Sequence, residues 1–103
     1  PGAIICSSLN ISSVAAYIRS KSACIIAAGG EHGMAEDCGI ALALMSKMNN
    51  VEMEPEVIAS LIHESSAGRN LCSIGYGEDV DFIARVNVFN IVPCFNGKVI
   101  MRI

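Results

Sequence analysis

The fold depends on one apolar stretch, Ala23-Cys24-Ile25-Ile26-Ala27-Ala28, which leads into the loop Gly29-Gly30-Glu31-His32-Gly33. Strands that are covered on both faces of a sheet have this continuous apolar character. A shorter apolar run, Ala3–Cys6, comes before it, and apolar residues recur at helical spacing between residues 11 and 18. Strand, helix and strand in this order predict a βαβ unit with parallel strands and a right-handed crossover.

Three more helices are predicted downstream. The first begins at Glu36-Asp37, where acidic side chains suit the positive end of the helix dipole. The second opens at Glu54-Pro55, with proline at the first helical position, and ends at residues 65–68. The third covers residues 79–86. On the first two of these helices, the residues expected to face inward are Ile40, Ala41, Leu44, Met45, Met48, Val57, Ile58, Leu61 and Ile62.

A β-hairpin is predicted near the end of the chain, because Asn96-Gly97 lies between two apolar segments, residues 92–95 and 98–103. We therefore expect one α/β segment over residues 1–103. Its architecture should be three-layer α/β/α, with a mixed, partly parallel sheet and the hairpin at its C-terminal end. A chain of this size buries a modest share of its surface, so its core must be economical. Because strands that are apolar on both faces need covering layers, we expect the segment to be part of a larger fold.

The composition of the chain argues against several classes of function. Of the 103 residues, 52% are apolar and 5% aromatic, and the net charge of −3 comes with no basic stripe, so nucleic-acid binding is not expected. We expect no signal peptide, and no apolar run approaches the roughly 20 residues that span a bilayer. The five cysteines form no C-x-x-C pair and lie in or beside apolar runs. This favours reduced, buried thiols in a cytoplasmic protein over disulfides or a zinc site.

Polar side chains follow both predicted parallel strands. The loop at residues 7–10 holds two serines and Asn10, and the loop at residues 29–33 holds Glu31 and leads to Glu36 and Asp37. Ligands collect at the carboxyl ends of such strands, and oxygen-rich groups suit Mg²⁺. The alternative is that Glu36 and Asp37 only stabilise a helix N-terminus while Glu31 is solvated.

A second candidate site is Ser65-Ser66-Ala67-Gly68-Arg69-Asn70, where hydroxyls, a glycine backbone and a guanidinium could hold phosphate or sulfonate oxygens. The alternative is a helix C-cap at Gly68 with a surface arginine. Other phosphatase signatures are absent, since no cysteine has an arginine six positions later. Asp79-Val80-Asp81 resembles a D-x-D nucleophile motif but lies on an amphipathic helix rather than after a strand.

The order of these motifs resembles the 2-phosphosulfolactate phosphatase family of coenzyme M biosynthesis. The features that carry the resemblance are Ser8-Leu9-Asn10, Ala28-Gly29-Gly30-Glu31, Glu36-Asp37, Ser66 to Leu71, Gly75 to Val80, and the ending with Val92-Pro93 and Asn96-Gly97. The resemblance covers nearly all of this chain and the C-terminal half of a family member. It implies a Mg²⁺-dependent hydrolase acting on a small phosphorylated sulfonate or carboxylate.

The resemblance also assigns roles by position. Asn10, Glu31, Glu36 and Asp37 would be the active-site polar groups, and Glu31, Glu36 and Asp37 the metal ligands. Ser8, Ser66 and Arg69 would contact the substrate. A rival interpretation is a non-catalytic half-domain that packs on a partner chain. Because strands that are apolar on both faces need covering layers, we expect either a homo-oligomer or association with a missing N-terminal half.

Overall fold

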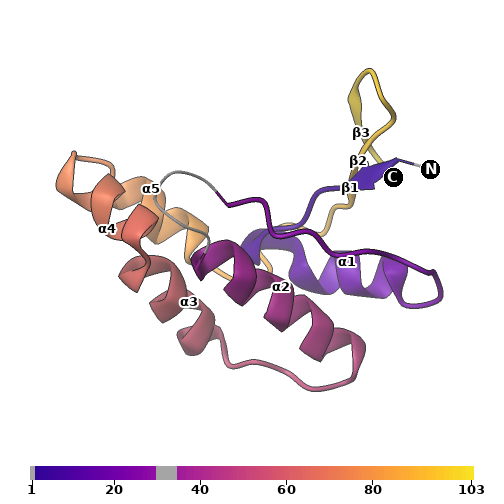
Figure 1. Cartoon of the computed structure of the whole chain (residues 1–103), viewed down its shortest axis with the longest axis horizontal. Coiled ribbons are helices and arrows are strands. Elements are labelled where there is room, and N and C mark those ends of the chain that lie inside the picture. Colours follow the sequence, from indigo (N-terminus) through magenta and orange to yellow (C-terminus); the bar gives the residue numbers. More distant parts are fainter. Residues whose placement is uncertain (1, 30–34) are drawn as a thin grey trace.

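Helices make up most of the part of the chain that the computed structural model describes, residues 2–29 and 35–103. The elements in chain order are β1 (Ala3–Ile4), the 3-10 helix η1 (Ser8–Asn10), α1 (Ile11–Ile18), α2 (Ala35–Met48), α3 (Pro55–Glu64), α4 (Ser66–Ser73), α5 (Gly77–Ile83), β2 (Pro93–Phe95) and β3 (Ile100–Arg102). Figure 1 shows the helices gathered in one body and the strands projecting from one end of it. None of the helices in the described ranges is long and apolar enough to cross a membrane.

The three strands form one sheet in the order β1-β2-β3, and both pairings are antiparallel. The predicted mixture of helices and strands is confirmed, but the prediction of a partly parallel sheet is wrong. Residues 23–28 form no strand and instead run back alongside α1 (Figure 1). The neighbour of β1 is β2, with Ala3 opposite Phe95, and the Ile5 amide extends this pairing by donating to the Pro93 carbonyl at 3.0 Å.

The C-terminal hairpin is confirmed, although its turn lies one residue later than Asn96-Gly97. The Asn96 amide donates to the Val99 carbonyl at 3.2 Å, so the two loop residues are Gly97 and Lys98. Gly97 has a φ of 99°, and glycine is favoured at the first loop position of such a turn. Asn96 closes the loop from outside it, because its Oδ1 accepts hydrogen bonds from the amides of Lys98 and Val99.

The helical body has one apolar core, to which α1 contributes most. The periodicity of residues 11–18 predicted this helix, and all four of its expected inward residues are buried. Helix α1 packs against α2, and α2 packs against α3. The buried apolar side chains of this core are Ile11, Val14, Ala15, Ile18, Ala43, Leu44, Ile58, Ile62, Val80 and Ala84.

The inward faces of α2 and α3 differ in part from the predicted ones. Met45 and Val57 are each 48% exposed, whereas Ala43, which was not predicted to face inward, is buried. The two helices also approach closely at Gly39, where an added Cβ would lie 2.9 Å from Leu61 Cδ1. A glycine at this position therefore lets the two helices approach closely, while Leu44, Ile58 and Ile62 are buried in the core.

Helix α4 was not predicted. Ser65 ends α3, as expected, but it also caps the next helix: its Oγ accepts from the Gly68 amide at 3.0 Å and donates to the Ile62 carbonyl at 2.7 Å. A single hydroxyl thus links the end of one helix to the start of the other. Helix α5 spans Gly77–Ile83, two residues earlier at its start than the predicted segment.

The cysteines are less buried than the sequence predicted. Cys24 and Cys72 are exposed, and Cys6, Cys38 and Cys94 are partly buried. The interpretation of uniformly buried thiols is therefore wrong for two of the five. Cys24 is exposed because residues 23–28 lie on the surface instead of inside a sheet.

We expect the thiols to divide by reactivity. In dilute native protein, Cys24 and Cys72 should react fast with an alkylating reagent, while Cys6 should react at least about ten times more slowly. Burial raises the pKa of the Cys6 thiol from 9.0 to about 11, so little of it is thiolate near neutral pH. Mass-spectrometric mapping of the alkylated cysteines over time measures this, and equal rates at Cys6 and Cys24 would contradict it.

The same pKa shift predicts how Cys6 affects stability in alkali. The unfolded chain releases the proton at lower pH than the folded chain does, because only the folded thiol is desolvated. The stabilisation is therefore present at neutral pH and is lost as the pH rises from 9 to 11. In Cys6→Ala, denaturant unfolding should show a smaller loss of stability over that window than in the parent protein.

Candidate functional site

The loop after β1 is built around Ser7 and Asn10. Ser7 caps η1, since its Oγ accepts from the Leu9 amide at 3.1 Å, and the Ser7 amide in turn donates to Asn10 Oδ1 at 2.8 Å. This reciprocal pattern is a capping box, which fixes the direction in which the chain enters α1. The end of β1 and the start of α1 are thereby held as one rigid corner.

Asn10 is only 5% exposed, and its side chain is occupied by the main chain. Besides the bond from Ser7, Nδ2 donates to the carbonyls of Ile5 at 3.1 Å and Ile91 at 3.3 Å. Both amide hydrogens and one oxygen lone pair are therefore committed. In this conformation, Asn10 joins the exit of β1 to the segment that leads into β2.

Ser8, predicted to contact substrate, is buried beside α5. Its Oγ donates to the Ile83 carbonyl, and its own carbonyl accepts from the Asn87 amide at 2.9 Å. The Asn87 side chain continues this contact by accepting from the Ser12 amide at 2.9 Å. Asn87-Val88 belongs to the C-terminal stretch that resembles the family, but no site role was predicted for Asn87. Its backbone has a φ of 57°, which asparagine tolerates better than most residues.

Glu36 and Asp37 lie in the first turn of α2, where the sequence predicted them. Asp37 Oδ2 accepts from the Gly29 amide at 2.8 Å, so this carboxylate holds the far end of the apolar segment. Glu36 Oε2 is buried and has no hydrogen-bond partner among the residues that the structure describes. Glu31, the third predicted ligand, lies outside the described residues.

The two carboxylates differ in their partners, because Asp37 Oδ2 accepts from the Gly29 amide whereas Glu36 Oε2 has no hydrogen-bond partner among the described residues. A buried, unpartnered carboxylate oxygen is costly, and a bound cation would satisfy it. Within residues 2–29 and 35–103, no group of three or more His, Cys, Asp or Glu side chains is placed to hold a metal. Of the three predicted metal ligands, the described residues include Glu36 and Asp37.

Ser66 and Arg69, also predicted to contact substrate, lie on α4. Both are exposed, and α4 packs against α3 and α5. Figure 1 shows α4 at the end of the helical body far from the sheet. The structure thus places this basic side chain on a different element from the loop after β1, and no described contact joins the two.

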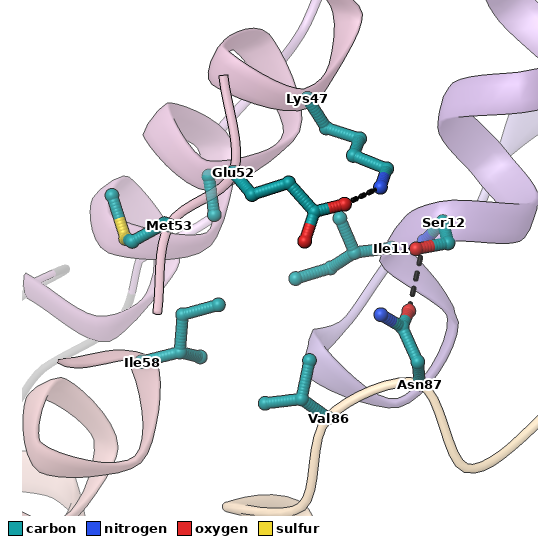
Figure 2. A pocket seen from close by; sticks show the side chains of 9 residues that line it. Ile11, Ser12, Lys47, Glu52, Met53, Ile58, Val86 and Asn87 are labelled. Atoms are coloured by element: carbon teal, nitrogen blue, oxygen red, sulfur yellow. Dashed lines mark hydrogen bonds and ion pairs between the residues drawn. The ribbon is translucent and has the colours of Figure 1, made fainter. Parts of the chain in front are cut away.

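One hollow adjoins the loop after β1, and another borders the start of α1. The first, of about 200 Å³, is mostly apolar; its lining is Ile5, Ser7, Leu9, Asn10, Phe89, Ile91 and Pro93. The other, shown in Figure 2, has only about 30 Å³ and lies between Ile11, Ile58 and Val86, with Lys47 and Glu52 paired across it. That volume admits about one water molecule. Because Glu52 neutralises the positive charge of Lys47, this small hollow does not favour an anion.

The chain matches a known protein family. The family model described as 2-phosphosulpholactate phosphatase matches residues 2–98, nearly the whole chain. No curated protein matches the sequence. The matched range includes the loop after β1, both carboxylates of α2, and α4.

Proposed function

Because the chain belongs to the 2-phosphosulpholactate phosphatase family, we propose that it takes part in hydrolysing a small anionic phosphate ester such as 2-phosphosulfolactate, with Mg²⁺ as cofactor. The observation that carries the proposal is the family match over residues 2–98. It is supported by the acidic first turn of α2, where a buried oxygen of Glu36 lacks a partner among the described residues.

Glu36 and Asp37 would hold the metal, together with Glu31 as the proposed third carboxylate. When bound, Mg²⁺ neutralises phosphate oxygens and orients them for in-line attack. Asp37 has a second role, since it accepts a hydrogen bond from the Gly29 amide and so holds the end of the segment before it. Asn10 acts as a positioning residue, because its amide holds the corner at which β1 meets α1.

The reaction is a simple hydrolysis. Water attacks phosphorus, the bond between phosphorus and the ester oxygen breaks, and a proton from water goes to the departing alkoxide. The products are inorganic phosphate and the free hydroxy acid. Ser66 and Arg69 on α4 are proposed to bind the substrate's second anionic group, because a guanidinium matches the oxygens of a sulfonate or carboxylate.

The test is phosphate release from 2-phosphosulfolactate with Mg²⁺ and with a chelator. We expect Glu36→Gln to lower kcat/KM by about 100-fold or more, a typical cost of losing one electrostatic stabiliser. Glu78→Gln is the matched control, because Glu78 is also an acidic residue in a first helical turn and should leave the rate unchanged. Equal losses in both variants would show that Glu36 has no special role.

A thermal melt gives a second measurement that needs no turnover. Mg²⁺ at a hundredfold excess over its Kd should stabilise the folded chain by about 2.7 kcal/mol. Glu36→Gln should remove most of this gain and Glu78→Gln should keep it. If the parent protein gains no stability from Mg²⁺ and releases no phosphate, the proposal is wrong.

The second candidate is the non-catalytic module that packs on a partner chain. The observation that favours it is a set of three exposed large apolar side chains on the described strands, namely Phe95, Ile100 and Met101. Exposed patches of this kind mark interaction sites. A chain that binds a partner protein but releases no phosphate in its presence would support this candidate over the enzyme.

A further inference from the structure

The turn between β2 and β3 contains Asn96-Gly97, the one place in the chain where glycine follows asparagine. Residues 96–98 are exposed, and Asn96 Oδ1 accepts hydrogen bonds from the Lys98 amide at 2.9 Å and the Val99 amide at 3.0 Å. Two backbone donors therefore converge on one side-chain carbonyl oxygen. Enzymes use such pairs of donors to stabilise an oxygen that gains negative charge when its carbonyl carbon is attacked.

The Gly97 nitrogen is the nearest nucleophile along the chain, because its attack on Asn96 Cγ closes a five-membered ring. Gly97 has no side chain to crowd the attack, and within residues 2–29 and 35–103 its amide donates to no acceptor. The leaving nitrogen, Asn96 Nδ2, contacts only Met101 Sδ at 3.7 Å, and a thioether is a weak acceptor. The turn thus holds the carbonyl oxygen and leaves the other reacting atoms free.

We propose that Asn96 is a self-modification site, at which the folded turn accelerates the loss of the side-chain amide. A solvent base takes the Gly97 N–H proton, the nitrogen forms a bond to Asn96 Cγ, and the carbonyl electron pair moves to Oδ1. The bond between Cγ and Nδ2 then breaks, and this nitrogen leaves as ammonia after taking a proton from water. Water opens the resulting cyclic imide at either carbonyl, which gives aspartate or isoaspartate.

The two products should affect the sheet differently. Aspartate keeps an oxygen that accepts from the Lys98 and Val99 amides, so the turn can close as before. Isoaspartate routes the main chain through its side-chain carbons and so adds one atom to the link between β2 and β3. The pairing of Phe95 with Ile100 lies directly beside this link. Isoaspartate should therefore loosen β3, whereas aspartate should only add a negative charge.

Asn50 provides a matched control within the same chain. Like Asn96 it is an exposed asparagine in a turn, and it has a φ of 61°. The next residue, however, is the β-branched Val51, whose amide donates to the Ser46 carbonyl at 2.8 Å. The nucleophile that would attack Asn50 is therefore engaged in the folded chain and is released when the chain unfolds.

The proposal does not rest on phosphatase activity, and its test uses the intact chain, native and unfolded in guanidinium chloride at one pH and temperature. Peptide mapping by mass spectrometry follows the modification of both asparagines over time. We expect Asn96 to react at least about threefold faster in the native chain, a modest factor because water weakens hydrogen bonds in an exposed turn. Asn50 should instead react faster in the unfolded chain.

The opposite responses of the two residues separate the turn from its sequence. Equal rates at Asn96 in the native and unfolded chains would assign the reaction to the Asn-Gly sequence alone. A slower native rate would show that the turn protects Asn96 instead of activating it. Either result would overturn the proposal.

Discussion

Gly68→Ala should destabilise the protein by about 3 kcal/mol, because the added methyl group has no room. Gly68 is buried in α4, and a Cβ there would lie 2.1 Å from the Ile62 carbonyl oxygen and 3.1 Å from Ser65 Oγ. The first contact is with backbone, so α4 would have to move away from the end of α3. That movement would also break the two hydrogen bonds of the Ser65 hydroxyl. A drop of roughly 15 °C in Tm is expected for a domain of this size.

The control for this substitution is Gly77→Ala. Gly77 is also helical, in α5, but an added Cβ there meets nothing within 4 Å. Alanine at such a site reduces the freedom of the unfolded chain, so stability should stay the same or rise slightly. Thermal melts of both variants test the pair. Similar stabilities for Gly68→Ala and the parent protein would mean that the junction of α3 and α4 is looser than the structure has it.

Ile58→Ala should cost about 2–5 kcal/mol, since it removes three carbon atoms from the centre of the core. Ile58 is only 3% exposed and belongs to the cluster that joins α1, α2, α3 and α5. The side chain also borders the small hollow of Figure 2, so the cavity left by the substitution would merge with existing space and would not close easily. Urea unfolding with a constant m-value measures the loss.

Val57→Ala, one residue earlier on α3, is the matched control. Val57 is 48% exposed, and its truncation should change the free energy of unfolding by no more than about 0.5 kcal/mol. The sequence pattern predicted both residues to face inward, so the two variants together test the orientation of α3. Equal losses would show that α3 is rotated relative to the described core.

Local patterns in the sequence predicted most of the helices. The errors concern features that depend on contacts between residues far apart in the chain. The buried residues of α1 recur every three or four positions, and that spacing follows from helix geometry alone. A parallel strand at residues 23–28 depends on which other strand pairs with it, and β1 pairs with β2 instead. Helix α4 was missed because Gly68 predicts a helix end. Here glycine is inside the helix, since only glycine fits against Ile62.

The candidate site also has a part that local sequence preferences predicted and a part that depends on tertiary contacts. The positions of Glu36 and Asp37 in a first helical turn were predicted from the preference of acidic residues for that place. The bonds of Asn10 were not predicted, because two of its partners are the backbone carbonyls of Ile5 and Ile91, which no residue type reveals. The position of α4 relative to the other site residues depends on tertiary packing against α3 and α5, and no spacing rule gives that.

The hydrogen bonds of Asn10 also determine what loss of its side-chain amide would do to the fold. Spontaneous deamidation converts an asparagine amide into a carboxylate, which accepts hydrogen bonds and has no N–H to donate. At position 10 the new oxygen would face the carbonyls of Ile5 and Ile91, to which the amide now donates. Two attractions would become repulsions at the point where the strands meet the helical body. A one-dalton change at Asn10 in stored protein would therefore mark molecules whose sheet has begun to separate from their helices.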